Sequence, residues 1–263
     1  MRTIRAKKAL GQHFLKDAEV ARSIAQTIAA YRDLPVLEVG PGTGALTRFL
    51  IEERYDLSVI ELDTEAIDFL RRNFPLPDER IIYGDFLQLD LRRLYDSKFC
   101  VIGNYPYYIS TQIFFKALEY KEQVVCCAGM VQKEVAERLA APAGGRTYGV
   151  ISALIQPWYT VEYMFTVGRE VFEPPPKVES AVVRLTRNER NSLGCNEQLY
   201  RQIVKTTFNQ RRKTLRNSIK PVLGGDFPDY AMPVFDKRPE QLSVEQFIEL
   251  TLIAQDFLGG NIV

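Results

Sequence analysis

Polar and aromatic residues follow an apolar stretch near the middle of the chain, in GNYPYYIS at residues 103–110. The amide oxygen of Asn104 and the backbone carbonyl of Tyr105 could accept both N–H bonds of an exocyclic amine. In adenine the lone pair of that amine is delocalised into the ring, so hydrogen bonds that favour a pyramidal nitrogen would make it more nucleophilic. Pro106 fixes the chain direction, and Tyr107 offers a face on which a base can stack. Together with the cofactor motifs described below, the segment predicts methyl transfer to an adenine amino group, by positioning and electrostatics. The alternative is a strand-end turn with tyrosines in the core.

Three glycines stand between an apolar segment and a helical one in LEVGPGTGALT at residues 37–47. Glycine allows a tight turn and the close approach of backbone to a ligand. Nicotinamide-dependent dehydrogenases use a similar turn, but their fingerprint is GxGxxG and the spacing here is GxGxG. The turn alone predicts a nucleotide-like ligand without deciding which one.

Two acidic residues end the next two predicted strands, Glu61 in VIELD and Asp85 in YGDF. A carboxylate 21 residues after Gly40 can take both hydroxyls of a ribose. Asp85 could accept a hydrogen bond from the amino group of an adenine. Because no basic residue near the turn could face a pyrophosphate, the three features together predict S-adenosylmethionine. Singly, each acid could equally be a solvated strand end or a turn cap.

Strands and helices alternate from about residue 17 to residue 187. Alternation of this kind implies crossover connections and a mainly parallel sheet with helices on both faces, an α/β fold. The predicted strands are residues 35–40, 57–63, 80–83, 98–103 and 123–131, with later ones near 159–167 and 178–186.

The pattern becomes purely helical after a polar stretch at residues 188–196. Ser243-x-x-Gln246 is a capping box that opens a last helix. We therefore expect two domains, residues 1–187 and a small C-terminal all-helical domain at 188–263.

Basic residues gather in two segments that contain no acid, residues 1–16 and 201–220, although the net charge is only +1. Such segments are typical of contact with a polyanion. The alternative is that both basic segments are ordinary solvent-exposed surfaces with no ligand.

Composition excludes several other classes. No run of 18 apolar residues is present, and the N-terminus lacks the apolar core of a signal peptide. His13 is the only histidine and the four cysteines show no CxxC spacing, so no metal site is expected. A reduced, cytoplasmic protein without a membrane partner is predicted.

Seven motifs in the same order along nearly the whole chain resemble the ribosomal RNA small-subunit adenine dimethyltransferase family. They are KKALGQHFL (7–15), LEVGPGTG (37–44), VIELD (59–63), GNYPYYIS (103–110), VQKEVAERL (131–139), FEPPPKVESAVVRL (172–185) and FNQRRKTLRNS (208–218). The resemblance implies a Rossmann-like class I methyltransferase sheet and S-adenosylmethionine as cofactor. Many relatives carry Leu where Tyr105 stands, and since that residue would act through its carbonyl we expect little change.

The resemblance also implies roles for individual residues. Asn104 would serve both the cofactor and the target amine, while Phe172 would hold the target adenine against Tyr107, and these three are the expected catalytic residues. The expected cofactor-binding residues are His13, Leu15, Gly40, Glu61, Asp85 and Asn104. The expected RNA-binding residues are Arg211, Arg212, Lys213 and Arg216.

The function that the resemblance implies is dimethylation of two adjacent adenosines in the 3′-terminal hairpin loop of 16S rRNA, within an assembling 30S particle. A monomer is expected. One alternative is a large-subunit rRNA adenine dimethyltransferase of the antibiotic-resistance type. A second alternative is a non-catalytic RNA-binding assembly factor. A third is a nicotinamide oxidoreductase, which would not explain the Asn-x-Pro-Tyr motif.

Overall fold

A computed structural model describes residue 7 and residues 12–260, and the chain divides into two compact units. The first contains the described residues up to Ala136 together with Thr160–Arg187, and the second contains Glu137–Tyr159 together with the described residues from Asn188 onward. One predicted break, at residue 188, coincides with a change of unit. The segment 1–187 is not one unit, however, because residues 137–159 pack with the C-terminal helices. The hydroxyl of Tyr200, for example, donates to the carbonyl of Ala153 at 2.8 Å.

The first unit is built on a seven-stranded sheet of strand order β4-β3-β2-β5-β6-β9-β7. The β2–β3, β3–β4, β2–β5 and β5–β6 pairs are parallel, whereas β9 is antiparallel to β6. The predicted mainly parallel α/β sheet is confirmed. Its strands are β2 (Val36–Val39), β3 (Leu57–Glu61), β4 (Ile81–Tyr83), β5 (Phe99–Asn104), β6 (Val124–Gln132), β7 (Tyr159–Val167) and β9 (Ser180–Arg187).

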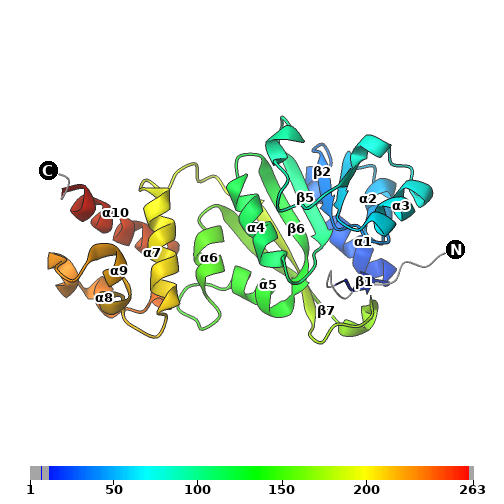
Figure 1. Cartoon of the computed structure of the whole chain (residues 1–263). Helices are drawn as coiled ribbons and strands as arrows, with labels where there is room; N and C mark the ends of the chain where they lie inside the picture. The colour runs from blue at the N-terminus through cyan, green and yellow to red at the C-terminus, as the bar shows by residue number, and fades with distance from the viewer. Residues whose placement is uncertain (1–6, 8–11, 261–263) are drawn as a thin grey trace. The chain divides into compact units, whose positions relative to one another are not determined.

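Helices cover both faces of this sheet, as the alternation of side chains along β6 shows. Cys126, Ala128 and Met130 belong to a hydrophobic cluster that also holds Ile24 of α1 and Phe49 of α2. The intervening residues of β6 point to the opposite face, which the helix α4 covers in Figure 1. The helices of this unit are α1 (Ala18–Gln26), α2 (Thr47–Glu52), α3 (Thr64–Asn73) and α4 (Ser110–Glu119), and α5 (Lys133–Ala140) runs from it into the second unit.

A separate two-stranded sheet joins two distant parts of the chain. β1 (Phe14–Leu15) pairs with β8 (Phe172–Glu173) in antiparallel fashion, with Leu15 opposite Phe172. This pairing brings the GQHFL segment beside the FEPPPKV segment.

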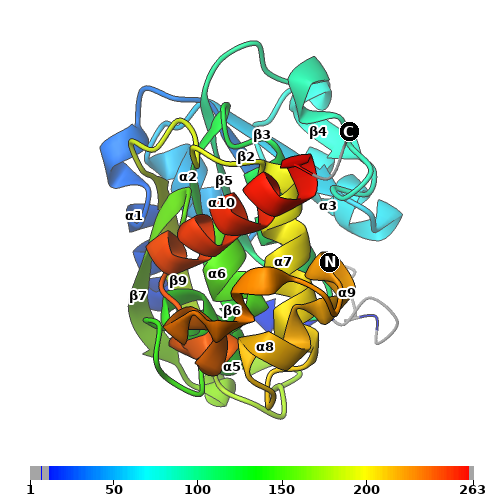
Figure 2. The ribbon, with the colours of Figure 1, turned by 90° about the vertical axis from the view of Figure 1, so that its left-hand side faces the viewer.

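The second unit is helical in its described part, apart from the first residue of β7. Its two longest helices, α7 and α10, lie side by side in Figures 1 and 2. The predicted capping box is confirmed, since Gln246 N donates to Ser243 Oγ and Ser243 N to Gln246 Oε1, both at 3.2 Å. The helices are α6 (Val150–Ile155), α7 (Glu197–Asn209), α8 (Leu215–Ser218), α9 (Lys220–Leu223) and α10 (Val244–Gly260).

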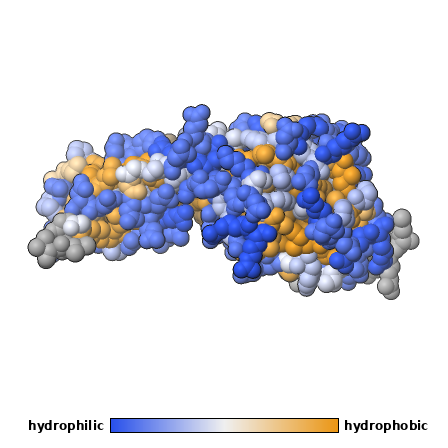
Figure 3. All heavy atoms as spheres, turned by 90° about the horizontal axis from the view of Figure 1, so that it is seen from above, coloured by the Kyte–Doolittle hydropathy of each residue, from blue (hydrophilic) through white to orange (hydrophobic). Residues whose placement is uncertain are grey.

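Short 3-10 helices connect these elements. They span Ala29–Tyr31, Asp78–Arg80, Leu91–Arg93, Arg169–Val171, Pro228–Ala231, Pro233–Asp236 and Pro239–Gln241. Hydrophilic residues cover most of the face drawn in Figure 3, with smaller hydrophobic patches between them. Among the described residues, no helix is both long enough and apolar enough to cross a membrane.

Candidate cofactor and substrate site

A pocket opens where several parallel strands of the first unit end. In an open α/β sheet this edge is where ligands bind. The segments that line it are residues 12–15, 38–43, 45–46, 60–62, 84–87 and 104–109. The pocket therefore brings together all six residues predicted to bind the cofactor, and Tyr107 with them.

Glu61 ends β3 and is held in place by backbone groups. Its Oε1 accepts from the N–H groups of Leu62 at 2.8 Å and Asp63 at 2.9 Å, and its Oε2 from Gly42 N at 3.0 Å. Burial raises the pKa of this carboxyl, against the hydrogen bonds that lower it. These backbone bonds fix the direction of the carboxylate at the pocket. Its contact with the ribose hydroxyls stays a prediction.

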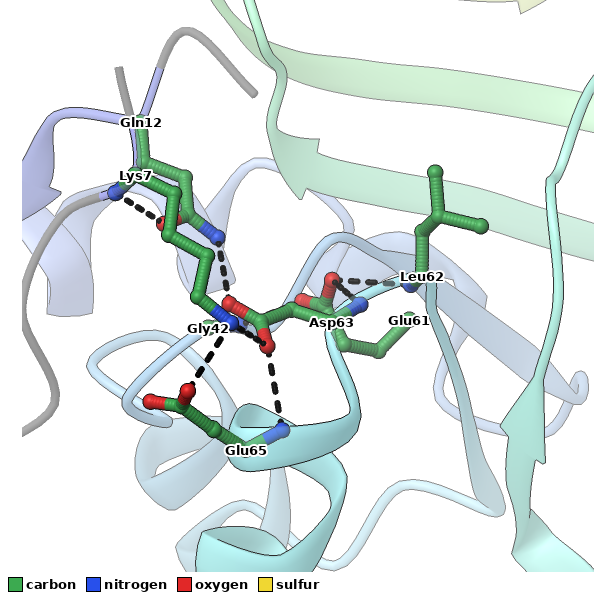
Figure 4. A network of polar contacts seen from close by, with 7 residues as sticks. All are labelled: Lys7, Gln12, Gly42, Glu61, Leu62, Asp63 and Glu65. Carbon is green, nitrogen blue, oxygen red and sulfur yellow. Dashed lines mark hydrogen bonds and ion pairs between the residues drawn. The ribbon is translucent and has the colours of Figure 1, made fainter. Parts of the chain in front are cut away.

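Asp63 ties the N-terminal segment to the same strand end, as Figure 4 shows. Its carboxylate caps α3 by accepting from Glu65 N, and it also accepts from Lys7 Nζ at 2.6 Å and Gln12 Nε2 at 3.3 Å. Burial acts to raise the pKa of Asp63, but the hydrogen bonds from Lys7, Glu65 N and Gln12 outweigh it and the pKa is lowered. Lys7 belongs to the predicted basic segment, of which residues 1–6 and 8–11 lie outside the described residues. In the structure the Lys7 ammonium forms ion pairs with Asp63 and Glu65.

The glycine turn after β2 has the backbone that its sequence predicts. Gly40, Gly42 and Gly44 have φ values of +70°, +56° and +76°, in the left-handed region that favours glycine. A Cβ on Gly44 would lie 2.2 Å from the ring of Phe74, so the turn also packs too tightly there for a side chain.

Asn104 ends β5 and contacts the N-terminal segment through its amide nitrogen. Asn104 Nδ2 donates to the carbonyl of His13 at 3.2 Å, which leaves the amide oxygen as the atom that could accept from a substrate. The His13 ring stacks on Tyr107 with 5.6 Å between ring centroids, and its Nδ1 lies 2.7 Å from the carbonyl of Pro174. Because a carbonyl only accepts, Nδ1 carries the proton.

The three tyrosines that follow Asn104 have different surroundings. Tyr105 is 1% exposed; its ring lies over Gly103 and Gly129, and its hydroxyl donates to Ala128 O at 2.7 Å. Tyr107 is half-buried with its hydroxyl 2.6 Å from Ser180 Oγ. Tyr108 is 59% exposed and lines the pocket. Tyr105 therefore supports the strand end, and the other two can face a ligand.

Phe172 does not lie where the sequence places it. Its side chain is 1% exposed and packs in the hydrophobic cluster of the sheet, and it does not line the pocket. Pairing of β8 with β1 directs this apolar ring into the core, so holding a base between Phe172 and Tyr107 would require the Phe172 ring to move from its described position. Tyr108 is the exposed aromatic residue at the pocket, and the sequence signal for it was the second tyrosine of PYY.

Glu38 is a pocket residue that sequence reasoning missed. It is 1% exposed on β2 and accepts from Thr47 Oγ1 at 2.7 Å. Burial raises the pKa of its carboxyl to about 8, and the nearby charge of Glu61 acts in the same direction. The available signal was an acid inside an apolar strand, immediately before the glycine turn.

The four predicted RNA-binding residues of the second unit fall into two pairs. Arg211 donates to Gly145 O at 3.2 Å and faces Glu240, while Arg216 forms an ion pair with Asp236. Arg212 and Lys213 are exposed, and within the described part of the chain neither forms an ion pair. Half of the predicted set is thus already paired within the protein.

Comparison with known proteins gives consistent matches over most of the chain. The family model described as ribosomal RNA adenine dimethylase matches residues 3–256. The chain is 64% identical over 258 residues to the ribosomal RNA small subunit methyltransferase A of Parabacteroides distasonis, covering 98% of this chain and 97% of that one. It is 54% identical over 257 residues to the protein of the same name from Porphyromonas gingivalis, covering 97% of this chain and 100% of the relative.

Two solved structures resemble the chain as a whole. A dimethyladenosine transferase from Plasmodium falciparum has a TM-score of 0.77 at 25% identity, covering 93% of this chain and 98% of that one. The 23S rRNA methyltransferase ErmE has a TM-score of 0.66 at 26% identity, covering 90% and 99% respectively.

Proposed function

The chain belongs to the ribosomal RNA adenine dimethylase family, and from that premise we propose its substrate and cofactor. The protein transfers methyl groups from S-adenosylmethionine to the N6 atoms of two adjacent adenosines in the 3′-terminal hairpin loop of small-subunit rRNA. The observation that carries this proposal is the position of Asn104, which lines one pocket together with Gly40, Glu61 and Asp85.

The pocket fits S-adenosylmethionine in the chemistry of its donors and acceptors. The carboxylate of Glu61 suits the hydroxyls of a ribose, and the carboxylate of Asp85 suits the amino group of an adenine. Leu62 is 44% exposed at the pocket and gives an apolar surface for the base. When bound, the cofactor supplies a methyl group on a positively charged sulfur. The carboxyl groups of Glu38 and Glu61 line the pocket that would hold it.

The residues of the chain position the target amine. The amide oxygen of Asn104 and the carbonyl of Tyr105 accept its two N–H groups, which favours the pyramidal nitrogen of the transition state. Tyr107 holds the base by stacking, and its own ring is fixed by His13 and Ser180. No strong base is required, because the methylated amine is cationic and loses its proton to water. The rate enhancement comes from positioning and fixed dipoles.

The proposed partner is small-subunit rRNA within an assembling 30S particle, bound by a monomer. Arg212 and Lys213 are exposed and have the charge to bind phosphates, which supply affinity without sequence specificity. An adenosine in a hairpin loop is partly unstacked, so placing it in a pocket costs less than extruding one from a duplex. A cytoplasmic location follows from a substrate of this kind.

The test uses the purified protein with labelled S-adenosylmethionine and under-methylated small subunits, and large subunits in a parallel reaction. We expect dimethyladenosine after digestion of the small-subunit RNA only. Label on the large subunit would support the antibiotic-resistance type of activity, for which the likeness to ErmE is the supporting observation. Tight binding of small subunits without label would support a non-catalytic assembly factor.

A further inference from the structure

Lys116 of α4 is a buried cation outside the residues considered so far. The residue is 8% exposed, and lysine is seldom buried to this extent without a partner. Its Nζ donates to the carbonyl oxygen of Leu87 at 2.8 Å. The ammonium also lies over two aromatic rings, 5.8 Å from the centroid of Phe86 and 5.4 Å from that of Tyr120.

The carbonyl that Lys116 binds belongs to the turn that carries Asp85. Residues 84–87 line the pocket after β4. Within the turn, Leu87 N donates to Asp85 Oδ1 at 2.9 Å, and Gln88 N donates to Asp85 O at 3.0 Å. Leu87 is therefore held at both of its peptide groups, with its N–H on the Asp85 carboxylate and its C=O on Lys116.

This arrangement fixes the direction of the Asp85 carboxylate. One oxygen of Asp85 is bound by Leu87 N, which belongs to the Phe86–Leu87 peptide. Lys116 binds the carbonyl of the next peptide, Leu87–Gln88, so Leu87 is restrained on both sides of its Cα and the N–H that holds the carboxylate has less freedom to move. Phe86, between them in sequence, is 3% exposed and packs beneath the ammonium.

We propose that Lys116 is a positioning residue for recognition of the adenine of the cofactor, acting through Leu87 on Asp85. The inference rests on the proposed function, since it takes Asp85 as the acceptor for the adenine amino group. Lys116 itself does not line the pocket, so the inference extends the proposed function to a residue behind the site.

A loss of stability alone would not identify this role. Burial lowers the pKa of Lys116, while the charges of Glu119, Asp85 and Asp90 act to raise it. Lys116→Met removes the donor and leaves the Leu87 carbonyl unpaired, so we expect its melting temperature to fall. The role is therefore tested on the ratio of two ligand affinities measured well below that temperature, because lower stability by itself does not change this ratio.

The experiment measures binding of two ligands by calorimetry, S-adenosylhomocysteine and S-inosylhomocysteine. The second carries a carbonyl where adenine carries its amino group, so the ratio of the two affinities reports the contact with Asp85. We expect the wild-type protein to prefer the adenine ligand. In Lys116→Met this preference should fall about tenfold, as expected when one hydrogen bond ceases to hold a recognition group.

Three further variants sharpen the test. Lys116→Gln keeps a donor for the Leu87 carbonyl without the charge, and it should restore part of the preference. Lys98→Met, at an exposed lysine, should change nothing. In an Asp85→Asn background, Lys116→Met should have no further effect on the preference, because two residues that act on one contact are not additive.

The inference and the proposed function fail in different ways. Equal weakening of both ligands by Lys116→Met, or an additive effect in the Asp85→Asn background, would overturn the positioning role and leave the function intact. Absence of any adenine preference in the wild-type protein would overturn the role as well, since Asp85 would then not read the base. If the wild-type protein bound neither ligand, the proposed function itself would be contradicted.

Discussion

The pocket of the first unit and the basic segment 201–220 of the second use polar groups in opposite ways. In the pocket, Glu61, Asp85 and Asn104 each hold a hydrogen bond to a backbone group of the chain, and their remaining atoms can face a ligand. In the basic segment, two arginines are paired with acids of the same unit while Arg212 and Lys213 are exposed. Orientation matters for chemistry on a single amine, whereas attraction to phosphates needs charge and little fixed geometry.

Removal of the Asn104 amide should have the largest effect, because it is the pocket group that orients the reacting nitrogen. We expect Asn104→Ala to lower the rate of methyl transfer by about 10²–10³-fold, the loss typical of one preorganised polar contact. Binding of small subunits should stay near the wild-type value. Single-turnover methylation and a separate subunit-binding assay measure the two quantities.

Asn73→Ala, at an exposed amide on α3, is the matched control and should be without effect. Near-normal methylation by Asn104→Ala would show that Asn104 does not orient the target amine. The comparison between oriented groups in the pocket and exposed charges in the basic segment would then lose its basis.

The buried carboxyl of Glu38 should make stability depend on pH. Its pKa is raised to about 8 in the folded protein by burial, so folding favours the protonated form. The free energy of unfolding should be greatest below the unfolded-state pKa and should fall by a few kcal/mol as the pH rises toward about 8. Urea unfolding across this range measures the slope, and Glu38→Gln should flatten it.

Glu52→Gln, at an exposed carboxyl, should keep the wild-type slope. An unchanged slope in Glu38→Gln would show that the pH dependence of stability arises at another group.

The support beneath the pocket should be sensitive to a single added methyl group. A Cβ on Gly103 would lie 2.5 Å from Val39 O and 2.8 Å from the Tyr105 ring. We expect Gly103→Ala to lower the free energy of unfolding by about 1–3 kcal/mol, as overpacking commonly does. Gly145→Ala, in a loop of the second unit with open space around it, should cost far less, and equal losses at the two sites would contradict the described packing.

The smallest effects are expected in the basic segment. Arg212→Ala should weaken subunit binding moderately and lower the slope of log affinity against log salt by about one, the value for one lost phosphate contact. Arg216→Ala should change the slope less, since Asp236 already faces that charge. Binding measured at several salt concentrations compares them, and a larger change for Arg216 would reverse the assignment.

The sequence predicts the strand ends better than it predicts the residues that come from elsewhere. Apolar runs followed by glycine, acid or amide place Gly40, Glu61, Asp85 and Asn104 at one edge of a parallel sheet, and the structure gathers them there. Their spacing is local, so it can be read from a short window of sequence.

What the sequence does not predict depends on long-range contacts. The burial of Phe172 follows from pairing with Leu15, more than 150 residues earlier, and the Lys7–Asp63 ion pair crosses from the N-terminus to β3. The hydrogen bond from Gly42 N that holds Glu61 depends on the backbone of the glycine turn. The membership of residues 137–159 in the second unit depends on α7, which comes later in the chain.

The discontinuous first unit has a consequence for its synthesis. β6 lies between β5 and β9 in the finished sheet, but residues 137–159 emerge from the ribosome before β9 does. Until about residue 187 is available, β6 is an unpaired sheet edge, of the kind that invites pairing with other chains. During synthesis of each copy, residues 137–159 are therefore made while this edge is still unpaired and before the C-terminal helices of their own unit exist. The edge is covered only when β9 pairs with β6.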